Sequence, residues 1–199
     1  RLGVVSAFRV AYWQARGLLP GMPWRDALAD LGPHLFDSVL WWLNAAGAGG
    51  PARVAATVRT ADLRSGLPEA GVWHCLVEMT GGATGVVEVG RATPGYVNGL
   101  QAEIAGTSGT VRTAFDASGG VVEFASLGDG RPEGAFRVVP TPPDVAVTYE
   151  AFPERHMTRI AEGILGRADF PGFEQGLRVQ RVIAAAARSA IERRWVDVE

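Results

Sequence analysis

This sequence of 199 residues contains no lysine, only one cysteine and no long hydrophobic run. All 19 lysine-or-arginine positions are arginine, which excludes Schiff-base chemistry and a lysine general acid within the chain. The single cysteine, Cys75, excludes an internal disulfide and a cysteine-rich zinc site, and it is compatible with a cytoplasmic protein. A membrane span needs about 20 apolar residues, and no segment approaches that length. No signal peptide is visible either.

The composition that is present fits one globular domain over residues 1–199, with 47% hydrophobic and 20% charged residues. A net charge of -2 favours neither nucleic acid nor an anionic membrane as a partner. No glycine-rich phosphate-binding motif follows a strand pattern, so we expect no nucleotide to be bound by this chain alone. The chain starts at Arg1 rather than at methionine, and we therefore expect it to be part of a longer protein.

The hydrophobic patterns predict an α+β protein. Alternating apolar residues and short glycine turns indicate a large, open and mostly antiparallel sheet, because parallel pairs need long crossovers. The predicted strands are residues 4–12, 53–63, 72–80, 84–92, 99–105, 110–115 and 121–125, with 137–139 as a short edge strand. Amphipathic spacing predicts helices over residues 33–45, 151–165 and 174–193. These helices should cover one face of the sheet.

The second face of the predicted sheet needs a cover of its own. In the strand 72–80, one side carries Trp73 and Cys75 and the other carries His74 and Leu76, so both sides include apolar residues. The chain has too few helices to cover both faces. We therefore expect a homodimer or homotetramer that assembles through this sheet face.

The most chemically informative stretch is residues 30–37, where Asp30, His34 and Asp37 precede an apolar helix. Pro33 suits the first turn of a helix, so Asp30 and His34 should lie at a helix entrance, and their spacing places them on one face. There His34 could exchange a proton while Asp30 or Asp37 holds its ring. The alternative is an Asp30 N-cap followed by a structural histidine.

Other candidates are weaker. Arg91, at a strand end, suits an anionic or hydroxyl-rich ligand, or is simply a solvated arginine. The spacing of His34, His74 and His156 does not favour a zinc site, so we predict no bound metal. Ser38 and Ser108 lack the surroundings of a catalytic nucleophile.

Four segments, in order, resemble the Gfo/Idh/MocA oxidoreductases, the glucose–fructose oxidoreductase and inositol dehydrogenase family. Residues 30–37 resemble its D-x-G-x-H-x-x-D segment, and residues 90–100 resemble its S-R-x-A-x-G-x-x-N-x-L stretch, with Gly90 in place of the serine. Residues 103–110 are similar to its E-I-x-G-x-x-G-S turn. Residues 176–182 and 193–198 are similar to its C-terminal ending.

The resemblance implies a C-terminal substrate-binding and oligomerising domain without the N-terminal Rossmann domain that binds NAD or NADP. Family members pass a hydride between the nicotinamide and a carbinol carbon, usually of a sugar or cyclitol. By this resemblance His34 and Asp30 are catalytic, with a lysine supplied from the missing domain, and Arg91, Asn98 and Asp37 bind a polyol or sugar substrate. The chain alone should be inactive. The alternative is a non-enzymatic ligand-binding or assembly module of the same fold.

Overall fold

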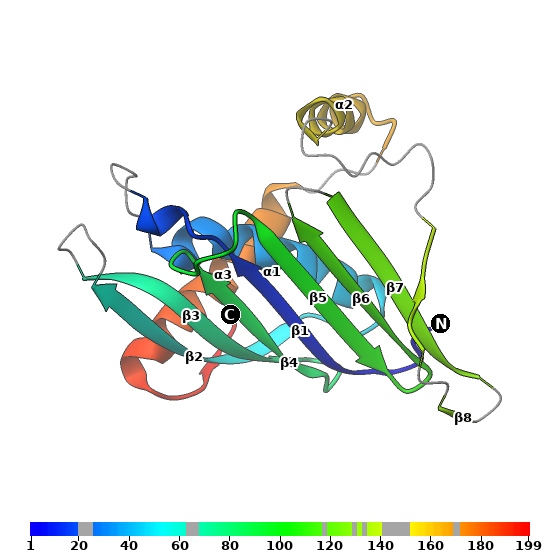
Figure 1. Ribbon diagram of the computed structural model, residues 1–199, viewed down its shortest axis with the longest axis horizontal. Helices are drawn as coiled ribbons and strands as arrows, with labels where there is room; N and C mark the ends of the chain where they lie inside the picture. The colour runs from blue at the N-terminus through cyan, green and yellow to red at the C-terminus, as the bar shows by residue number, and fades with distance from the viewer. Residues whose placement is uncertain are drawn as a thin grey trace.

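The structure is a computed structural model that describes residues 1–19, 26–62, 68–116, 119–128, 131–132, 135–140, 152–168 and 172–199. Over these residues the chain is an α+β protein in which a broad sheet is covered on one face by helices (Figure 1). No helix in this described part is long and apolar enough to span a membrane. The proline-rich stretch from Pro132 to Pro143 and the loop residues 20–25 lie partly or wholly outside it.

The sheet contains ten strands within the described residues, in the order β10-β2-β3-β4-β1-β5-β6-β7-β8, with β9 also paired to β7. Their bounds are β1 Val5–Trp13, β2 Pro51–Asp62, β3 Pro68–Met79, β4 Thr84–Gly90, β5 Gly99–Gly106, β6 Gly109–Asp116, β7 Gly119–Gly128, β8 Arg131–Pro132, β9 Arg137–Val138 and β10 Val196–Asp197. The prediction of a mostly antiparallel sheet is confirmed. The exception is the parallel pair of β1 and β4.

The first strand of the chain lies in the middle of the sheet. β1 is parallel to β4, with Trp13 opposite Gly90, and antiparallel to β5, with Trp13 opposite Gly99. The chain between β1 and β4 includes a helix and two strands, which is the long crossover that a parallel pair requires. As a result, the carboxyl ends of two neighbouring strands leave the sheet at the same edge.

Two helices cover one face of the sheet. α1 (Ala27–Ala45) packs against β1, β3 and β4, and α3 (Phe173–Glu192) packs against β2 and α1. The core between them contains Phe36 and Leu35 of α1, Val182 of α3, and Val10 and Val87 of the sheet, all nearly inaccessible to solvent. α2 (Phe152–Ile164) stands apart from this layer in Figure 1.

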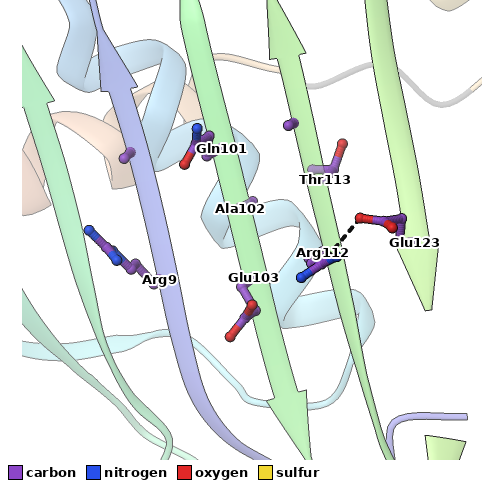
Figure 2. Close-up of a pocket in the computed structure, with 9 residues that line it drawn as sticks. Arg9, Gln101, Ala102, Glu103, Arg112, Thr113 and Glu123 are labelled. Atoms are coloured by element: carbon purple, nitrogen blue, oxygen red, sulfur yellow. Dashed lines mark hydrogen bonds and ion pairs between the residues drawn. The ribbon is translucent and has the colours of Figure 1, made fainter. Parts of the chain in front are cut away.

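The opposite face of the sheet, called the open face below, is not covered by any helix of the described chain. Arg9, Glu103, Arg112 and Glu123 project from four adjacent strands of this face, as Figure 2 shows. They line a hollow of about 370 Å³. In β3 the alternation is clear, since Trp73 and Cys75 are buried under the helices while His74 and Leu76 are exposed on the open face.

The start of the first helix was predicted wrongly. α1 begins at Ala27, not at Pro33, because the side chain of Asp26 accepts the backbone N–H groups of Leu28 and Ala29 at 2.7 and 3.1 Å. Asp26 is therefore the N-cap, and not Asp30. Pro33 lies inside the helix rather than in its first turn.

Three short elements had no counterpart in the sequence prediction. They are the 3₁₀ helix η1 (Arg16–Leu18) and the two-residue strands β8 and β10. The last of them adds a strand next to β2, with Val196 opposite Val54. Segments this short contain too few residues to show a hydrophobic period.

Candidate functional site

The candidate site lies at the sheet edge where β1 and β4 end. The two chain segments that leave these strands are joined by backbone hydrogen bonds from Gln14 N to Gly90 O at 2.8 Å and from Gly17 N to Arg91 O at 2.9 Å. Ala15 N also donates to Tyr96 O at 2.7 Å. Side chains on the two segments are therefore held at fixed positions relative to each other.

The segment between β4 and β5 is a compact turn. Gly95 adopts φ +93°, a conformation that favours glycine. The ring of Tyr96 packs edge-on against Trp13, with centroids 5.1 Å apart, and lies where a Cβ on Gly99 would be. This turn brings Asn98 back to the covered side of the sheet, next to the end of β1.

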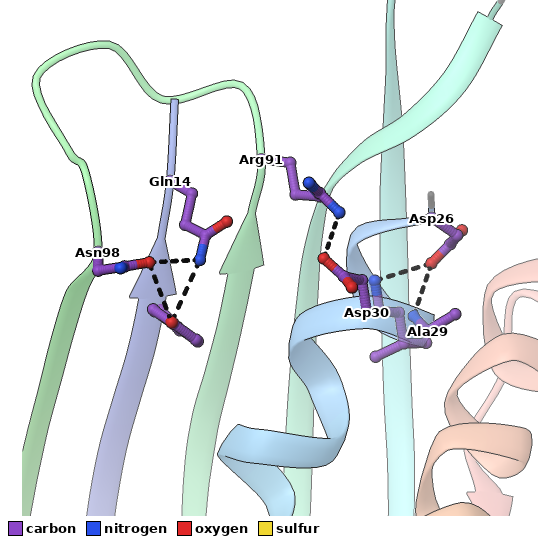
Figure 3. A network of polar contacts seen from close by, with 8 residues as sticks. Gln14, Asp26, Ala29, Asp30, Arg91 and Asn98 are labelled. Carbon is purple, nitrogen blue, oxygen red and sulfur yellow. Dashed lines mark hydrogen bonds and ion pairs between the residues drawn. The ribbon is translucent and has the colours of Figure 1, made fainter. Parts of the chain in front are cut away.

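Arg91 and Asp30 form an ion pair that joins the end of β4 to the first turns of α1 (Figure 3). Nη1 of Arg91 donates to Oδ2 of Asp30, and the two side chains are 9% and 28% exposed. The alternative of a solvated strand-end arginine is therefore wrong. The other carboxylate oxygen of Asp30 accepts no hydrogen bond from the described residues.

Asn98 is held by two residues of the β1 end. Its Oδ1 accepts from Gln14 Nε2 at 2.6 Å and from the hydroxyl of Tyr12 at 3.2 Å, and Gln14 Nε2 also lies 3.2 Å from that hydroxyl (Figure 3). Because Oδ1 is occupied by donors, the orientation of the amide is fixed. Within the described residues the Nδ2 group of Asn98 donates to no acceptor, so it remains available to a ligand.

His34 lies one turn after Asp30 and is exposed. Its ring meets the ring of Tyr12 edge-on, with centroids 6.3 Å apart and an interplanar angle of 79°. No described residue hydrogen-bonds to the imidazole. The expectation that Asp30 or Asp37 holds this ring is wrong, because Asp30 binds Arg91 and Asp37 accepts a hydrogen bond from Gln175 of α3 at 3.0 Å.

Six side chains thus meet at one edge of the sheet, and we call them the polar edge cluster: Tyr12, Gln14, Asp30, His34, Arg91 and Asn98. The sequence analysis predicted four of them as site residues, namely Asp30, His34, Arg91 and Asn98. The fifth predicted residue, Asp37, lies instead at the contact between α1 and α3. Tyr12 and Gln14 were not predicted as site residues. Their signal is the alternation of β1, in which Phe8 and Val10 are followed on the same face by these two polar positions.

Two buried donors near the cluster have no acceptor in the described chain. They are Nε of Arg91 and Nε1 of Trp73. Trp73 lies opposite Val89 of β4, two residues before Arg91, so both donors lie near the carboxyl end of β4. Buried donors without acceptors are unfavourable, and they are typical of places where a ligand or water supplies the oxygen.

The cluster combines an exposed imidazole, a carboxylate with a free oxygen, and amide and guanidinium donors. Such a mixture of donors and acceptors suits a ligand with several hydroxyl groups. His34 supplies the imidazole of the cluster, the side chain that most often exchanges protons in enzymes. Within the described residues no group of three or more His, Cys, Asp or Glu side chains could hold a metal ion.

A family model described as the GFO/IDH/MocA C-terminal domain matches residues 1–112, more than half of the chain. No curated protein matches the sequence. The fold is similar to an NAD binding oxidoreductase from Klebsiella pneumoniae (24% identity, TM-score 0.84). It is also similar to an oxidoreductase domain protein from Kribbella flavida (25% identity, TM-score 0.79).

The fold is also similar to levoglucosan dehydrogenase in complex with NADH and levoglucosan (24% identity, TM-score 0.82). Each of these three matches covers 100% of this chain. The chain spans only 60% of the Klebsiella protein and 59% of the other two.

Proposed function

Because this chain belongs to the GFO/IDH/MocA C-terminal domain family, we propose that it is the substrate-binding and oligomerising part of an NAD(P)-dependent oxidoreductase that acts on a sugar or cyclitol hydroxyl. The observation that carries the proposal is the polar edge cluster, in which Asp30 and His34 of α1 meet the carboxyl ends of β1 and β4.

The substrate class is supported from two directions. The cluster offers both donors and acceptors around an exposed histidine, as a polyol requires. Similar solved structures include levoglucosan dehydrogenase in complexes with NADH and levoglucosan and with NADH and L-sorbose. We therefore propose a neutral sugar or cyclitol rather than a nucleotide or a peptide.

Each member of the cluster has a proposed role. His34 exchanges the proton of the reacting hydroxyl, and Asp30 accepts a hydrogen bond from a substrate hydroxyl through its free oxygen. Arg91 fixes the position of Asp30, and Asn98, oriented by Gln14 and Tyr12, donates to the substrate. Asp37 is assigned to helix packing instead of substrate binding, because it is bound by Gln175.

The cofactor is proposed to be bound mainly outside residues 1–199, which we take as one domain. When bound, NAD or NADP supplies the hydride acceptor, and it would be held by the part of the similar oxidoreductases that this chain does not cover. The residues of this chain hold the substrate and manage its proton. A second copy of the chain is proposed to cover the open face.

Substrate binding can be tested on the chain itself. Titration with levoglucosan, L-sorbose or inositol, followed by backbone NMR, should shift the amides of residues 14–17, 26–34 and 91–98. The exposed variant His34→Ala should weaken these shifts, whereas the matched variant His74→Ala, on the open face, should leave them unchanged. Shifts confined to the open face, or equal in both variants, would contradict the proposed site.

A further inference from the structure

Three polar side chains at the end of β1 and the start of β5 form a closed set of hydrogen bonds. Nε2 of Gln14 donates to Oδ1 of Asn98 at 2.6 Å and to the hydroxyl of Tyr12 at 3.2 Å, and that hydroxyl donates to the same Oδ1 at 3.2 Å (Figure 3). Gln14 and Asn98 are only 5% and 8% exposed, so water competes little for these bonds. The two amides therefore hold each other in one orientation.

The orientation of Gln14 decides what Asn98 offers to a ligand. A side-chain amide has an oxygen that accepts and an NH2 group that donates. Because the NH2 group of Gln14 points at Asn98, the Asn98 oxygen is occupied and its Nδ2 group is left for the site. The buried donors that lack an acceptor in the described chain belong to Arg91 and Trp73. Nδ2 of Asn98, which also lacks an acceptor there, is therefore accessible to a ligand.

A reversed set of hydrogen bonds would present the opposite group to the ligand. If both amides turned over, the oxygen of Gln14 would accept from Nδ2 of Asn98, and Oδ1 of Asn98 would face the site. The structure contains the first set, in which Asn98 is a donor. A hydroxyl group of a ligand can bind to either set, because it both donates and accepts. An ether oxygen only accepts, so it can bind only to the first set.

The specificity of the site follows from this difference. We propose that Gln14 is a specificity-determining residue that fixes Asn98 as a donor to an ether oxygen of the substrate, such as the ring or bridge oxygen of a sugar. This inference rests on the function proposed above and narrows its substrate class. A fixed donor gives no advantage to a cyclitol such as inositol, which carries only hydroxyl oxygens, but it favours a sugar whose ether oxygen has no proton to donate.

Tyr12 connects this amide with the group that we propose to exchange the proton. Its hydroxyl contacts Asn98, and its ring meets the ring of His34 edge-on, with centroids 6.3 Å apart. Asn98 and His34 thus contact one and the same tyrosine. A sugar that gives its reacting hydroxyl to His34 would present another oxygen of the same molecule to Asn98. Gln14 does not touch the reacting atoms in this arrangement and acts through the amide that it positions.

The orientation of the two amides can be measured without a ligand. In side-chain amide NMR of the chain, the NH2 group of Gln14, which is bound by Asn98 and Tyr12, should exchange with water about 10-fold more slowly than the NH2 group of Asn98. The reverse order would show that Asn98 presents its oxygen to the site. Equal rates would show that the two amides interchange freely. Either result would overturn the proposal.

Levoglucosan is the probe for ligand binding, because its ring and bridge oxygens only accept hydrogen bonds, and inositol is the comparison. Levoglucosan should shift the side-chain NH2 signal of Asn98 downfield and slow its exchange with water. Backbone shifts in residues 26–34 without any change at this NH2 group would overturn the inference but leave the proposed site standing. Binding of inositol alone would contradict the narrowed substrate class. If neither ligand shifts any of these signals, the proposed function fails and the inference fails with it.

Gln14→Glu tests the role of Gln14 directly. A carboxylate only accepts, so it should attract the Nδ2 group of Asn98 and turn Oδ1 toward the ligand. The dissociation constant for levoglucosan should rise about 10-fold or more, because two oxygens without a proton would face each other, while that for inositol should change by less than about 3-fold. Gln101→Glu makes the same chemical change on the open face and is the matched control, which should alter neither constant.

Gln14→Met is a second, neutral variant for the case that the buried carboxylate prevents folding. It removes the partner of Asn98 without reversing the amide, so levoglucosan should lose less affinity than with Gln14→Glu. Inositol should again bind almost as tightly as to the native chain. Equal losses for levoglucosan and inositol would show that Gln14 only supports the structure. An unchanged affinity for levoglucosan in the folded variants would show that Gln14 does not determine what Asn98 offers.

Discussion

At the scale of single residues, the central feature is a buried arginine, Arg91, that forms an ion pair with the carboxylate of Asp30. Arg91 and Asp30 are separated by 61 positions in the sequence, and their pairing follows only from the arrangement of β4 and α1. The sequence singled out both residues but assigned Asp30 to His34. It could not show the pairing, because it carries no information on which strand end lies over which helix.

The first prediction concerns this ion pair. Asp30→Ala should lower the free energy of unfolding by about 2 kcal/mol, because it leaves a largely buried guanidinium whose Nε already lacks an acceptor. In the double variant with Arg91→Met the loss should be smaller than the sum of the two single losses, by about 1 kcal/mol. Urea unfolding of the four chains measures this coupling.

The control for this cycle is Arg159→Met on α2. Arg159 is 61% exposed and pairs with Glu162 at 3.5 Å, so its removal should change the free energy of unfolding by less than about 0.5 kcal/mol. Equal losses for Arg91 and Arg159, or strict additivity in the cycle, would show that the buried pair has no special role.

The second prediction concerns Cys75, which lies 1% exposed under the helices. Burial raises the pKa of its thiol to about 12. At pH 8 a thiol reagent should therefore react with the folded chain at least about 100-fold more slowly than with the chain in urea. Fast reaction of the folded chain would contradict the packing of β3.

The same shift makes stability depend on pH. An unfolded thiol ionises near pH 8.5, whereas the folded one stays neutral up to about pH 12. Its contribution is complete below the unfolded pKa and is lost as pH rises toward the folded pKa. The free energy of unfolding should therefore fall above about pH 8.5, and Cys75→Ala should reduce that slope.

At the scale of elements, the sequence predicted the existence of every long helix and strand but not all of their ends. Alternation in residues 72–80 and 84–92 identified β3 and β4, because each has one buried and one open side. The predicted start of α1 at Pro33 is six residues too late, because proline also suits the first turn of a helix. The stronger signal was Asp26, which precedes a run of good helix formers.

The third prediction concerns Ser189, which joins α3 to β2 and to the segment that follows α3. Its hydroxyl accepts from Ala56 N of β2 at 2.9 Å and donates to Arg194 O at 2.6 Å, while its side chain is buried in α3. Ser189→Ala would leave the Ala56 N–H without an acceptor in the core. We expect a loss of about 2 kcal/mol in the free energy of unfolding.

Ser38→Ala is the matched control for this change. The hydroxyl of Ser38 only donates to His34 O within its own helix, at 2.9 Å, so its loss should cost less than about 0.5 kcal/mol. If the two serine variants unfold at the same urea concentration, Ser189 does not tie α3 to β2.

At the scale of the whole molecule, the fold class was predictable and the position of β1 was not. Short turns require antiparallel neighbours, which gave the sheet its direction from the sequence alone. Placing the first strand between β4 and β5 requires contacts over about half of the chain, and no local pattern encodes them. This placement assembles the polar edge cluster, so Tyr12 and Gln14 were missed as site residues.

We propose different roles for the two faces of the sheet, substrate binding for one and association with a second copy for the other. The covered face ends in the polar edge cluster, where substrate would bind, and the open face, which carries Arg9, Glu103, Arg112 and Glu123, would meet a second copy. The edge and the open face share strands β1 and β4. Association of two copies would therefore hold the strands that position Arg91 and Gln14.

The most direct test of the account is the turnover of the NAD(P)-dependent oxidoreductase that contains this chain. With levoglucosan or inositol as substrate, His34→Ala should lower kcat by about 100-fold or more, as expected for loss of a proton-exchanging group, with a much smaller change in KM. His74→Ala should keep the native kcat. A His34→Ala enzyme that forms NADH or NADPH at the native rate would contradict the role of His34 and of the polar edge cluster.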